Sequence, residues 1–241
     1  MSGQITVVTG GSRGIGAATC ERLARDGHDI VLNYRSDAEA AEQVAAAVRA
    51  AGARCVTVQG DTASEQDVDA LFDAAAELGP VTGLVNNAGI TGPVGRLVDV
   101  DADGIRRTLD VNVLGVLLCA RRAARDMAGR GGAIVNVSSG AATTGGAGEY
   151  VHYAASKAAV DTITIGLSKE LGPDGIRVNT VSPGVIWTDI HADPERPARI
   201  AEQVPLGRAG DPPEIAAAIA WLLSPDASYT NGANIRVAGG R

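Results

Sequence analysis

The sequence is poor in aromatic residues, cysteine and histidine. Only 3% of its 241 residues are aromatic, and it contains three cysteines and three histidines. The cysteines, Cys20, Cys55 and Cys119, are an odd number among apolar neighbours, which favours small buried side chains over a disulfide framework. The histidines are far apart and show no metal-ligand spacing. The sequence therefore predicts neither a disulfide nor a metal site.

Positive charge and long hydrophobic runs are also scarce. The formal net charge is −7, so the chain lacks the excess of basic residues that is typical of nucleic-acid-binding proteins. The longest apolar run, Ile215–Leu223, is far shorter than the ~20 residues that cross a membrane. The first ten residues have no basic region and no signal-peptide cleavage pattern. We therefore expect a cytoplasmic protein that binds neither nucleic acid nor membrane.

What the sequence does have is a regular alternation of short β-branched segments with longer alanine-rich ones. This alternation predicts an α/β fold over residues 1–241: one Rossmann-type domain, with a doubly wound parallel sheet of about seven strands and helices on both faces. The expected strands are Ile5–Thr9, Ile30–Tyr34, Cys55–Gln59, Gly83–Asn86, Ala133–Ser138, Arg177–Ser182 and Asn234–Val237. The expected helices are Ile15–Asp26, Ala38–Ala51, Glu65–Leu78, Asp103–Ala128, Tyr150–Leu171 and Pro213–Leu223.

The least regular part of the chain is Trp187–Arg208, which has three prolines, scattered charge and only a short helical stretch near Arg199. It follows a predicted strand, and open α/β sheets bind their ligands beyond the carboxyl ends of the strands. We expect residues 187–208 to form a flap over the substrate. An ordinary surface excursion is the alternative.

A glycine-rich loop, Thr9–Gly16 (TGGSRGIG), joins the first predicted strand to the first predicted helix. Glycines permit a tight turn and let the backbone approach a pyrophosphate, while the free N–H groups of the following helix face the anion. A glycine cluster alone is weak evidence, but the strand before it and the helix after it strengthen the prediction. The loop therefore predicts a dinucleotide site.

The end of the second predicted strand indicates which dinucleotide. It lacks the acidic residue that would bind a ribose diol; instead Arg35 is present, with Arg13 in the glycine loop, and arginine suits a 2′-phosphate. We therefore expect NADP(H) to be preferred, with NAD(H) possible. Two alternatives stay open: Ser36 fits a helix capping box, and Asp37 would reach the ribose if the strand ended later.

With the glycine loop, several further motifs make the chain resemble the short-chain dehydrogenase/reductase family, most closely its bacterial 3-oxoacyl-carrier-protein reductases and glucose dehydrogenases. The resemblance covers nearly the whole chain and implies an NAD(P)-dependent oxidoreductase. It also implies a homotetramer, assembled through the helices Asp103–Ala128 and Tyr150–Leu171 and the C-terminal strand region. The motifs are TGGSRGIG (Thr9–Gly16), NNAG (Asn86–Gly89), Asn112, Ser138–Ser139, YAASK (Tyr153–Lys157), SPG (Ser182–Gly184) and the final NGANIRVAGG.

The same resemblance implies a set of cofactor contacts. Thr62 departs from the family pattern, which has an apolar residue there. Together with Arg35 and Ser36 from the end of the second strand, the expected contacts are Gly10, Ser12, Arg13, Gly14, Ile15, Gly16, Asp61, Thr62, Asn87, Ala88, Gly89, Tyr153, Lys157, Pro183, Gly184, Ile186 and Thr188.

Tyr153 and Lys157 are four residues apart, so they share one face of a predicted helix. A free tyrosine has a pKa of ~10 and is a poor base at neutral pH. A cation ~4 Å away, at an effective dielectric of ~20, favours tyrosinate by about 4 kcal/mol. We therefore expect Lys157 to lower the pKa of Tyr153, so that the phenol exchanges a proton with a substrate oxygen.

Two further residues complete a candidate catalytic set. Ser139 ends the fifth strand and would donate a hydrogen bond to the substrate oxygen. Ser138 is its rival, because side chains alternate along a strand; the family resemblance selects Ser139. Asn112 would hold a water that links Lys157 to solvent, or would simply make an interhelical hydrogen bond.

The expected reaction moves a hydride between the nicotinamide and a carbonyl or secondary alcohol. The expected substrate is a small carbonyl compound or an acyl thioester; a sugar or alcohol dehydrogenase is the alternative, and a non-catalytic dinucleotide sensor is a weaker one. An acidic acyl carrier would need a basic patch, which Arg196, Arg199 and Arg208 would form unless they are merely solvated surface.

Overall fold

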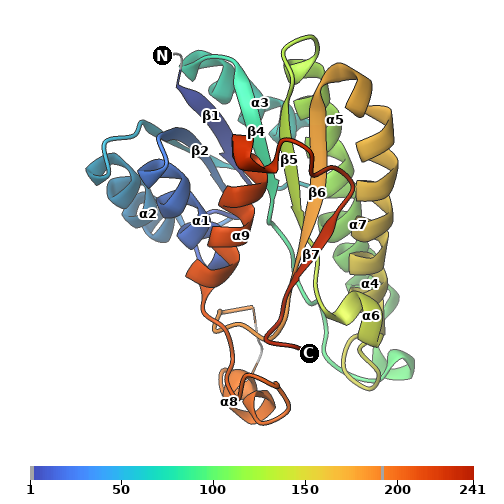
Figure 1. The fold of residues 1–241 in the computed structure, drawn as a ribbon. Helices are drawn as coiled ribbons and strands as arrows, with labels where there is room; N and C mark the ends of the chain where they lie inside the picture. The colour runs from blue at the N-terminus through green and yellow to red at the C-terminus, as the bar shows by residue number, and fades with distance from the viewer. Residues whose placement is uncertain (1–2, 191–192) are drawn as a thin grey trace.

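The computed structural model describes residues 3–190 and 193–241, and a sheet of seven parallel strands forms the centre of this part of the chain (Figure 1). The strand order is β3-β2-β1-β4-β5-β6-β7, so the sheet grows in opposite directions from β1 and β4. All carboxyl ends therefore meet at one edge. The strands are β1 (Gln4–Val8), β2 (His28–Tyr34), β3 (Cys55–Gln59), β4 (Val81–Asn86), β5 (Gly132–Val137), β6 (Ile176–Pro183) and β7 (Asn234–Val237).

Helices cover both faces of this sheet, and the predicted fold class is confirmed (Figure 1). On one face α1, α2 and α9 bury residues such as Leu23 and Ile219; on the other, α3, α5 and α7 bury residues such as Phe72 and Met127. The helices are α1 (Gly14–Arg25), α2 (Ala38–Ala50), α3 (Glu65–Leu78), α4 (Ala102–Leu109), α5 (Gly115–Met127), α6 (Ala141–Thr144), α7 (Val151–Glu170), α8 (Arg196–Ala201) and α9 (Pro212–Leu223), with short 3₁₀ turns at Leu97–Asp99, Gly172–Asp174 and Pro225–Ala227.

The helix expected over Asp103–Ala128 is present as one continuous helical run over residues 102–127, but part of it has a geometry that the sequence did not predict. A π-helical segment, Asp110–Leu114, separates α4 from α5. Asn112 lies in this segment, and its side chain hydrogen-bonds the backbone of a neighbouring loop, which stabilises the widened turn. Hydrophobic periodicity does not reveal this change, because one widened turn barely disturbs the apolar pattern on either side.

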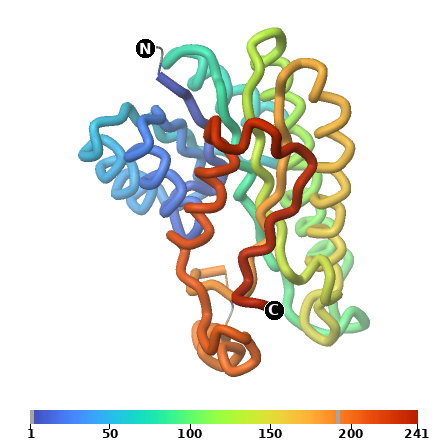
Figure 2. The backbone as a smooth tube through the Cα atoms, in the orientation of Figure 1, coloured from blue at the N-terminus to red at the C-terminus, as the bar shows by residue number. Residues whose placement is uncertain are grey.

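The segment expected as a flap lies beyond the carboxyl ends of the strands, next to the C-terminal residues (Figures 1 and 2). It has a small core of its own, in which Ile200 and Val204 pack against Val185 and Ala209. The backbone N–H of Leu206 donates to the carbonyl of Gly239 at 3.1 Å. Residues 191–192 of the expected flap lie outside the described residues. The segment is therefore held both to the residues that follow β6 and to the chain end.

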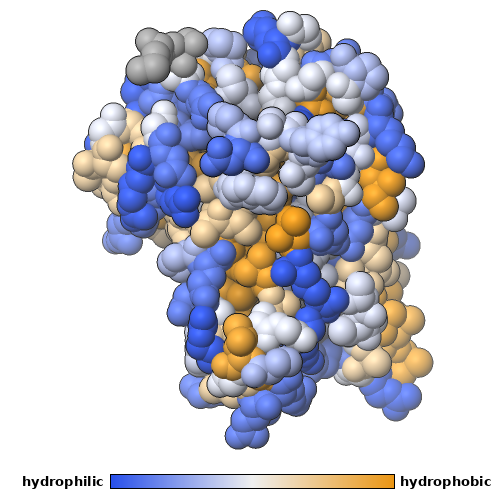
Figure 3. Space-filling model, viewed as in Figure 1, coloured by the Kyte–Doolittle hydropathy of each residue, from blue (hydrophilic) through white to orange (hydrophobic). Residues whose placement is uncertain are grey.

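The molecular surface in Figure 3 has hydrophobic atoms in the hollow between α9 and β7. A small cavity there is lined by apolar residues that include Val185, Ile215 and Val237.

Within residues 3–190 and 193–241, no helix combines the length and the hydropathy that crossing a membrane requires.

Candidate active site

Two adjoining cavities lie at the carboxyl edge of the sheet. The first, which we call the loop cavity, has a volume of about 1490 Å³ and lies beside the glycine loop. The second, the tyrosine cavity, has a volume of about 990 Å³ and lies beside Tyr153. Both include Ile15, Asn87 and Thr188 in their walls, so they form one continuous crevice. It opens near the carboxyl ends of the neighbouring strands β1 and β4, where the strand order reverses. Doubly wound sheets bind their ligands at this position.

Nearly all of the expected site residues line one cavity or the other. Gly16 and Asn112 line neither. The loop cavity is lined by Gly10, Ser12, Arg13, Gly14, Ile15, Arg35, Ser36, Asp61, Thr62, Asn87, Ala88, Gly89 and Thr188. The tyrosine cavity is lined by Ser139, Tyr153, Lys157, Pro183, Gly184 and Ile186.

The glycine loop is held open by its neighbours. The amide nitrogen of Asn87 donates to the carbonyls of Thr9 and Gly10, both at 2.9 Å, and the Thr9 hydroxyl accepts from the backbone N–H groups of Asn87 and Ala88. Gly10 and Gly14 have φ angles of 62° and 52°, which other residues rarely adopt. Since α1 begins at Gly14 without a side-chain cap, its first N–H groups are free to bind an anion.

Two residues that hold this loop act from behind it. Gly16 is buried under the turn, and a Cβ there would lie 2.2 Å from the carbonyl oxygen of Gly10, so the structure gives it a packing role. Asn33, which the sequence did not single out, accepts from the Gly10 N–H at 3.3 Å and donates to the carbonyl of Gly60 at 3.0 Å. A buried polar residue at the end of an apolar strand was the available signal.

The charged wall of the loop cavity centres on Asp61. Its Oδ2 atom lies 3.2 Å from Arg35 and 2.7 Å from Arg107, a residue that the sequence did not single out. The three side chains are partly or largely open to solvent, at 24%, 62% and 34% exposure for Asp61, Arg35 and Arg107. The expected arginine is therefore in place, but a carboxylate competes for it.

The two alternatives at the end of β2 are settled by where α2 begins. The helix starts at Ala38, and the Asp37 side chain caps it by accepting from the N–H of Ala40 at 3.0 Å. The expectation that Ser36 caps the helix is therefore wrong, because the helix starts one residue too late for it. Ser36 lines the cavity, whereas Asp37 is committed to the cap.

In the tyrosine cavity, β5 and α7 bring three side chains together. Ser139 follows β5 and lines the same cavity as Tyr153, near enough to act on the pKa of its hydroxyl, while its Oγ accepts from the N–H of Ala141 at 3.1 Å. Ser138 points the other way and donates to the carbonyl of Lys157 at 3.0 Å. Of the two serines, Ser139 is therefore the one placed against the tyrosine. Lys157 is 4% exposed, and its Nζ donates to the carbonyl of Val137 at 2.8 Å.

The expectation that Lys157 lowers the pKa of Tyr153 is wrong for this cavity. Burial raises the pKa of the Tyr153 hydroxyl above its usual value, and Ser139 opposes this only in part. The Lys157 Nζ lies 5.8 Å from the centre of the Tyr153 ring, and burial lowers its own pKa to about 8. Desolvation therefore outweighs the charge attraction, and Tyr153 rests as a protonated phenol, which is a proton donor.

Asn112 is fully buried beside the same cavity. Its Nδ2 donates to the carbonyl of Ile90 and to the Ser156 hydroxyl, and its Oδ1 accepts from the N–H of Ile90, all at 2.9 Å. A Cβ built on Gly89 would lie 3.3 Å from both Asn112 Oδ1 and Lys157 Nζ. The side chain thus joins the π-helical segment to the loop after β4 and to α7, as the interhelical alternative expected, and it also borders the space next to Lys157.

The described residues contain no group of His, Cys, Asp and Glu side chains that would hold a metal ion. His191 lies outside the described residues. The three cysteines are buried and unpaired, as predicted.

Comparisons with known proteins agree with this geometry. The family model described as "Enoyl-(Acyl carrier protein) reductase" matches residues 10–241. An uncharacterised oxidoreductase of Escherichia coli, YgfF, is 46% identical over 98% of this chain and 99% of its own length. A cis-4-hydroxycyclohexanecarboxylate dehydrogenase of Sinomonas cyclohexanicum is 42% identical over 98% and 96%.

A solved structure extends the likeness to three dimensions. A short-chain dehydrogenase of Burkholderia cenocepacia in complex with NADP has a TM-score of 0.93 and 40% identity, covering 98% of this chain and 97% of that one. Matches of this extent span the glycine loop, the Tyr153–Lys157 pair and the final strand together. This chain belongs to the short-chain dehydrogenase/reductase family of oxidoreductases.

Proposed function

We propose that the protein is an NADP(H)-dependent carbonyl reductase that forms a secondary alcohol from a small carbonyl compound. One observation carries the proposal: Ser139 and Tyr153, whose buried phenol has a raised pKa, line a cavity that is continuous with the cavity beside the glycine loop. A phenol that is kept protonated suits the reductive direction, because reduction requires a proton donor. Oxidation of an alcohol would require the same phenol to ionise first.

The residues of the loop cavity fit a phosphorylated dinucleotide. Gly10 and Gly14 leave open the cradle at the start of α1, where a Cβ on Gly14 would press on Thr188 at 3.1 Å. The free N–H groups there suit a pyrophosphate, and Arg13, Arg35 and Ser36 line the wall that would receive a 2′-phosphate. Asn87, Ala88 and Gly89 would border the adenosine, and Ile186 and Thr188 the nicotinamide. The NADP of the Burkholderia cenocepacia structure supports this preference.

When bound, the nicotinamide would supply the hydride, and this chain would control the oxygen of the substrate. Ser139 and Tyr153 would hydrogen-bond that oxygen, and Tyr153 Oη would give it a proton as negative charge develops. Lys157, which is cationic below a pKa of about 8, would stabilise the tyrosinate left behind. Asn112 would fix the π-helical segment against α7 through its hydrogen bond to Ser156 and so position Lys157, and a water held beside it would return the proton.

The surface arginines favour a small substrate over one delivered by an acidic carrier protein. The sequence offered Arg196, Arg199 and Arg208 as a basic patch. Each forms an ion pair instead: Arg196 with Glu149, Arg199 with Asp193 and Arg208 with Glu214, at 2.5–2.7 Å. A patch whose charges are already neutralised attracts an acidic partner weakly.

The assembly and location expected from the sequence stay predictions. A homotetramer built through α5, α7 and the C-terminal strand region is supported by apolar side chains on the outer helix faces, among them Leu117 and Ile165, which are 42% and 49% exposed. Light scattering of the purified protein measures the mass that tests it. Fractionation of cells tests the expected cytoplasmic location.

The function is tested by following the 340-nm absorbance of NADPH and NADH with a panel of cyclic ketones, keto acids and acetoacetyl thioesters. We expect turnover with at least one small ketone and a preference for NADPH. Tyr153→Phe should lower kcat by about 10²–10⁴-fold, since the proton donor is lost, with NADPH binding unchanged. Full activity of Tyr153→Phe would contradict the assigned role, and NADPH binding without turnover on any carbonyl would favour the sensor.

A further inference from the structure

The charged side chains that line the tyrosine cavity are cationic. Among the described residues that line it, four have cationic side chains, Lys157, Arg196, Arg236 and Arg241, and none is Asp or Glu. The chain as a whole has the opposite bias, with 28 acidic residues against 21 basic ones. A cavity of one charge sign in a protein of the other concentrates oppositely charged ligands within it.

Two of the four cations already have partners. Lys157 donates to the carbonyl of Val137, as described above. Arg196 forms a 2.7 Å ion pair with Glu149, donates to the Tyr150 hydroxyl, and stacks over the Tyr150 ring at 5.4 Å from its centre. These contacts occupy Arg196 and hold α8 against the loop before α7. Neither side chain is free to bind an anion without giving up a contact.

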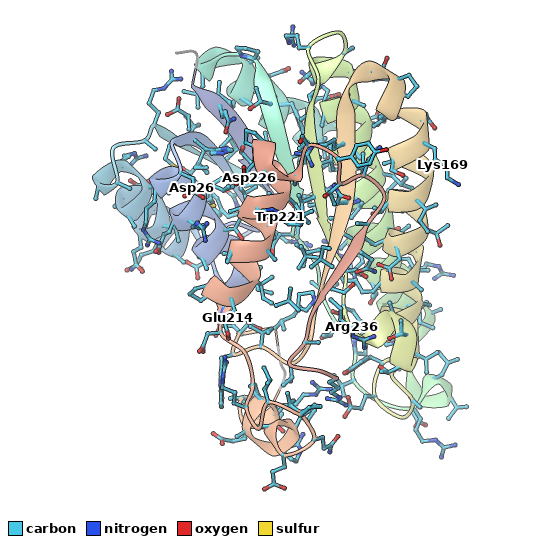
Figure 4. All side chains as sticks on the ribbon, viewed as in Figure 1. Asp26, Lys169, Glu214, Trp221, Asp226 and Arg236 are labelled. Carbon is cyan, nitrogen blue, oxygen red and sulfur yellow. The ribbon has the colours of Figure 1, made fainter. Side chains whose placement is uncertain are left out.

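Arg236 and Arg241 differ from these two. Within the part of the chain that the structure describes, neither guanidinium group has an ion pair or a side-chain hydrogen bond. Arg236 projects from β7 on the side of α6 and α7 (Figure 4), and its Nη2 would lie 3.4 Å from a Cβ on Gly140, the residue after Ser139. Two unneutralised guanidinium groups therefore border the cavity that holds Ser139 and Tyr153.

Arg241 approaches the same place from the chain end. Burial raises the pKa of the Tyr150 hydroxyl, and the charges of Arg196 and Arg241 act against it, which places Arg241 within electrostatic range of Tyr150. The Tyr150 ring in turn meets the Tyr153 ring edge-on, with 5.3 Å between their centres. Arg236 on β7 and Arg241 at the chain end therefore both border the cavity that holds the tyrosine pair.

We infer that the substrate is an oxo or hydroxy carboxylic acid, whose carboxylate is bound by Arg236 and Arg241 while its reacting oxygen lies between Ser139 and Tyr153. This inference rests on the proposed function and names its substrate class. The planar guanidinium fork matches a carboxylate in two parallel hydrogen bonds. The phosphates of the cofactor belong at the opposite end of the crevice, beside the glycine loop, so they do not account for these two cations.

Kinetics with a matched pair of ketones test the assignment. We expect 4-oxocyclohexanecarboxylate to be reduced with a kcat/KM at least tenfold above that of its methyl ester, which has the same ring and carbonyl but no charge. Arg236→Gln and Arg241→Gln should each lower kcat/KM for the acid by about 10- to 100-fold, mostly through KM, and leave the ester unchanged. Arg106→Gln removes one exposed positive charge from α4, outside both cavities. This control variant should leave kcat/KM unchanged for both the acid and the ester.

Calorimetry gives a readout that does not depend on turnover. Cyclohexanecarboxylate should bind to the protein saturated with NADP⁺, its methyl ester should bind at least tenfold more weakly, and Arg236→Gln should abolish the difference. Cyclohexyl phosphate in a parallel titration distinguishes a carboxylate site from a phosphate site, because tighter binding of the phosphate would overturn the carboxylate assignment. Equal binding of acid and ester would overturn the anion site itself. An ester that is reduced with the same kcat/KM as the acid would also overturn the anion site, but it would leave the proposed reductase function intact. Absence of turnover on every carbonyl compound would refute the reductase function alone.

Discussion

Two charged clusters of the crevice, one around Asp61 and one around Tyr153 and Lys157, lie in opposite environments. In the loop cavity, Arg35, Asp61 and Arg107 form ion pairs that solvent reaches. In the tyrosine cavity, Tyr153 and Lys157 are 8% and 4% exposed, and no Asp or Glu side chain of the described residues lines the wall. Water screens the first set, so each charge there changes binding by a modest amount. The second set is desolvated, so the same kind of change alters protonation and therefore the reaction itself.

Lys157 gives the largest expected effect in this comparison between buried and exposed charges. A buried cation should lower the free energy of unfolding of the protein while it supports catalysis. Lys157→Met fills similar space without charge. We expect kcat to fall by about 10²–10⁴-fold. We also expect the variant to be more stable at pH 7: a pKa lowered from 10.5 to about 8 corresponds to about 3 kcal/mol, and losing the hydrogen bond to Val137 cancels about 1 kcal/mol.

The pH dependence of this gain in stability has a definite sign. Below pH 8, Lys157 is charged in both the folded and the unfolded chain, so the cost of burying the charge is fully present. Between about pH 8 and 10.5 the unfolded chain binds more protons than the folded one, so wild-type stability rises with pH. Thermal unfolding from pH 7 to 10 should therefore show the advantage of Lys157→Met shrinking. A variant that is less stable than the wild type at pH 7 would show that Lys157 is better solvated than its burial implies.

A smaller effect is expected in the loop cavity, from Arg35→Ser. Arg35 lines the wall assigned to the 2′-phosphate and is 62% exposed. We expect kcat/KM for NADPH to fall by about tenfold, since a charge-assisted contact is lost, while that for NADH and the melting temperature stay unchanged. Arg22→Ser, which removes an exposed arginine from an ion pair with Asp26 on α1, is the matched control. An equal loss with both cofactors would assign Arg35 to the loop structure instead of to phosphate recognition.

The sequence predicted the parts of this molecule that local signals specify. The bounds of β3, β7 and α3 agree to the residue; α3, for example, begins after the capping side chain of Ser64 and ends before Gly79. The order of strands and helices, and the meeting of Ser139, Tyr153 and Lys157 in one cavity, follow from the alternating pattern and the family motifs.

The rest depends on contacts between distant parts of the chain. Arg107 reaches Asp61 across 46 residues, and Arg236 reaches the Ser139 side of the cavity from the last strand. No local pattern indicates either. The pKa of Tyr153 was expected in the wrong direction because spacing places the lysine nearby but gives no measure of burial. Local rules thus predict which residues meet, whereas desolvation depends on everything packed around them.

The smallest expected effect comes from Asp61→Asn, which removes one negative charge and almost nothing else. Asp61 Oδ1 accepts from the N–H of Ala63 at 3.0 Å, and the asparagine carbonyl keeps that bond, whereas the ion pairs of Oδ2 with Arg35 and Arg107 are lost. The two released arginines should raise kcat/KM for NADPH over NADH by about threefold at low salt, and less at 0.5 M salt, because exposed charges are screened.

The double variant Arg35→Ser/Asp61→Asn shows whether Arg35 or Arg107 is responsible for the change in cofactor preference. If Asp61 acts by competing for Arg35, most of the gain in the NADPH to NADH ratio should disappear in the double variant, which a double-mutant cycle measures as a coupling between the two positions. A gain that persists would assign the phosphate to Arg107. A fall in the ratio for Asp61→Asn alone would mean that the carboxylate positions Arg35 for the phosphate instead of competing with it, and the loop cavity would then be as finely organised as the tyrosine cavity.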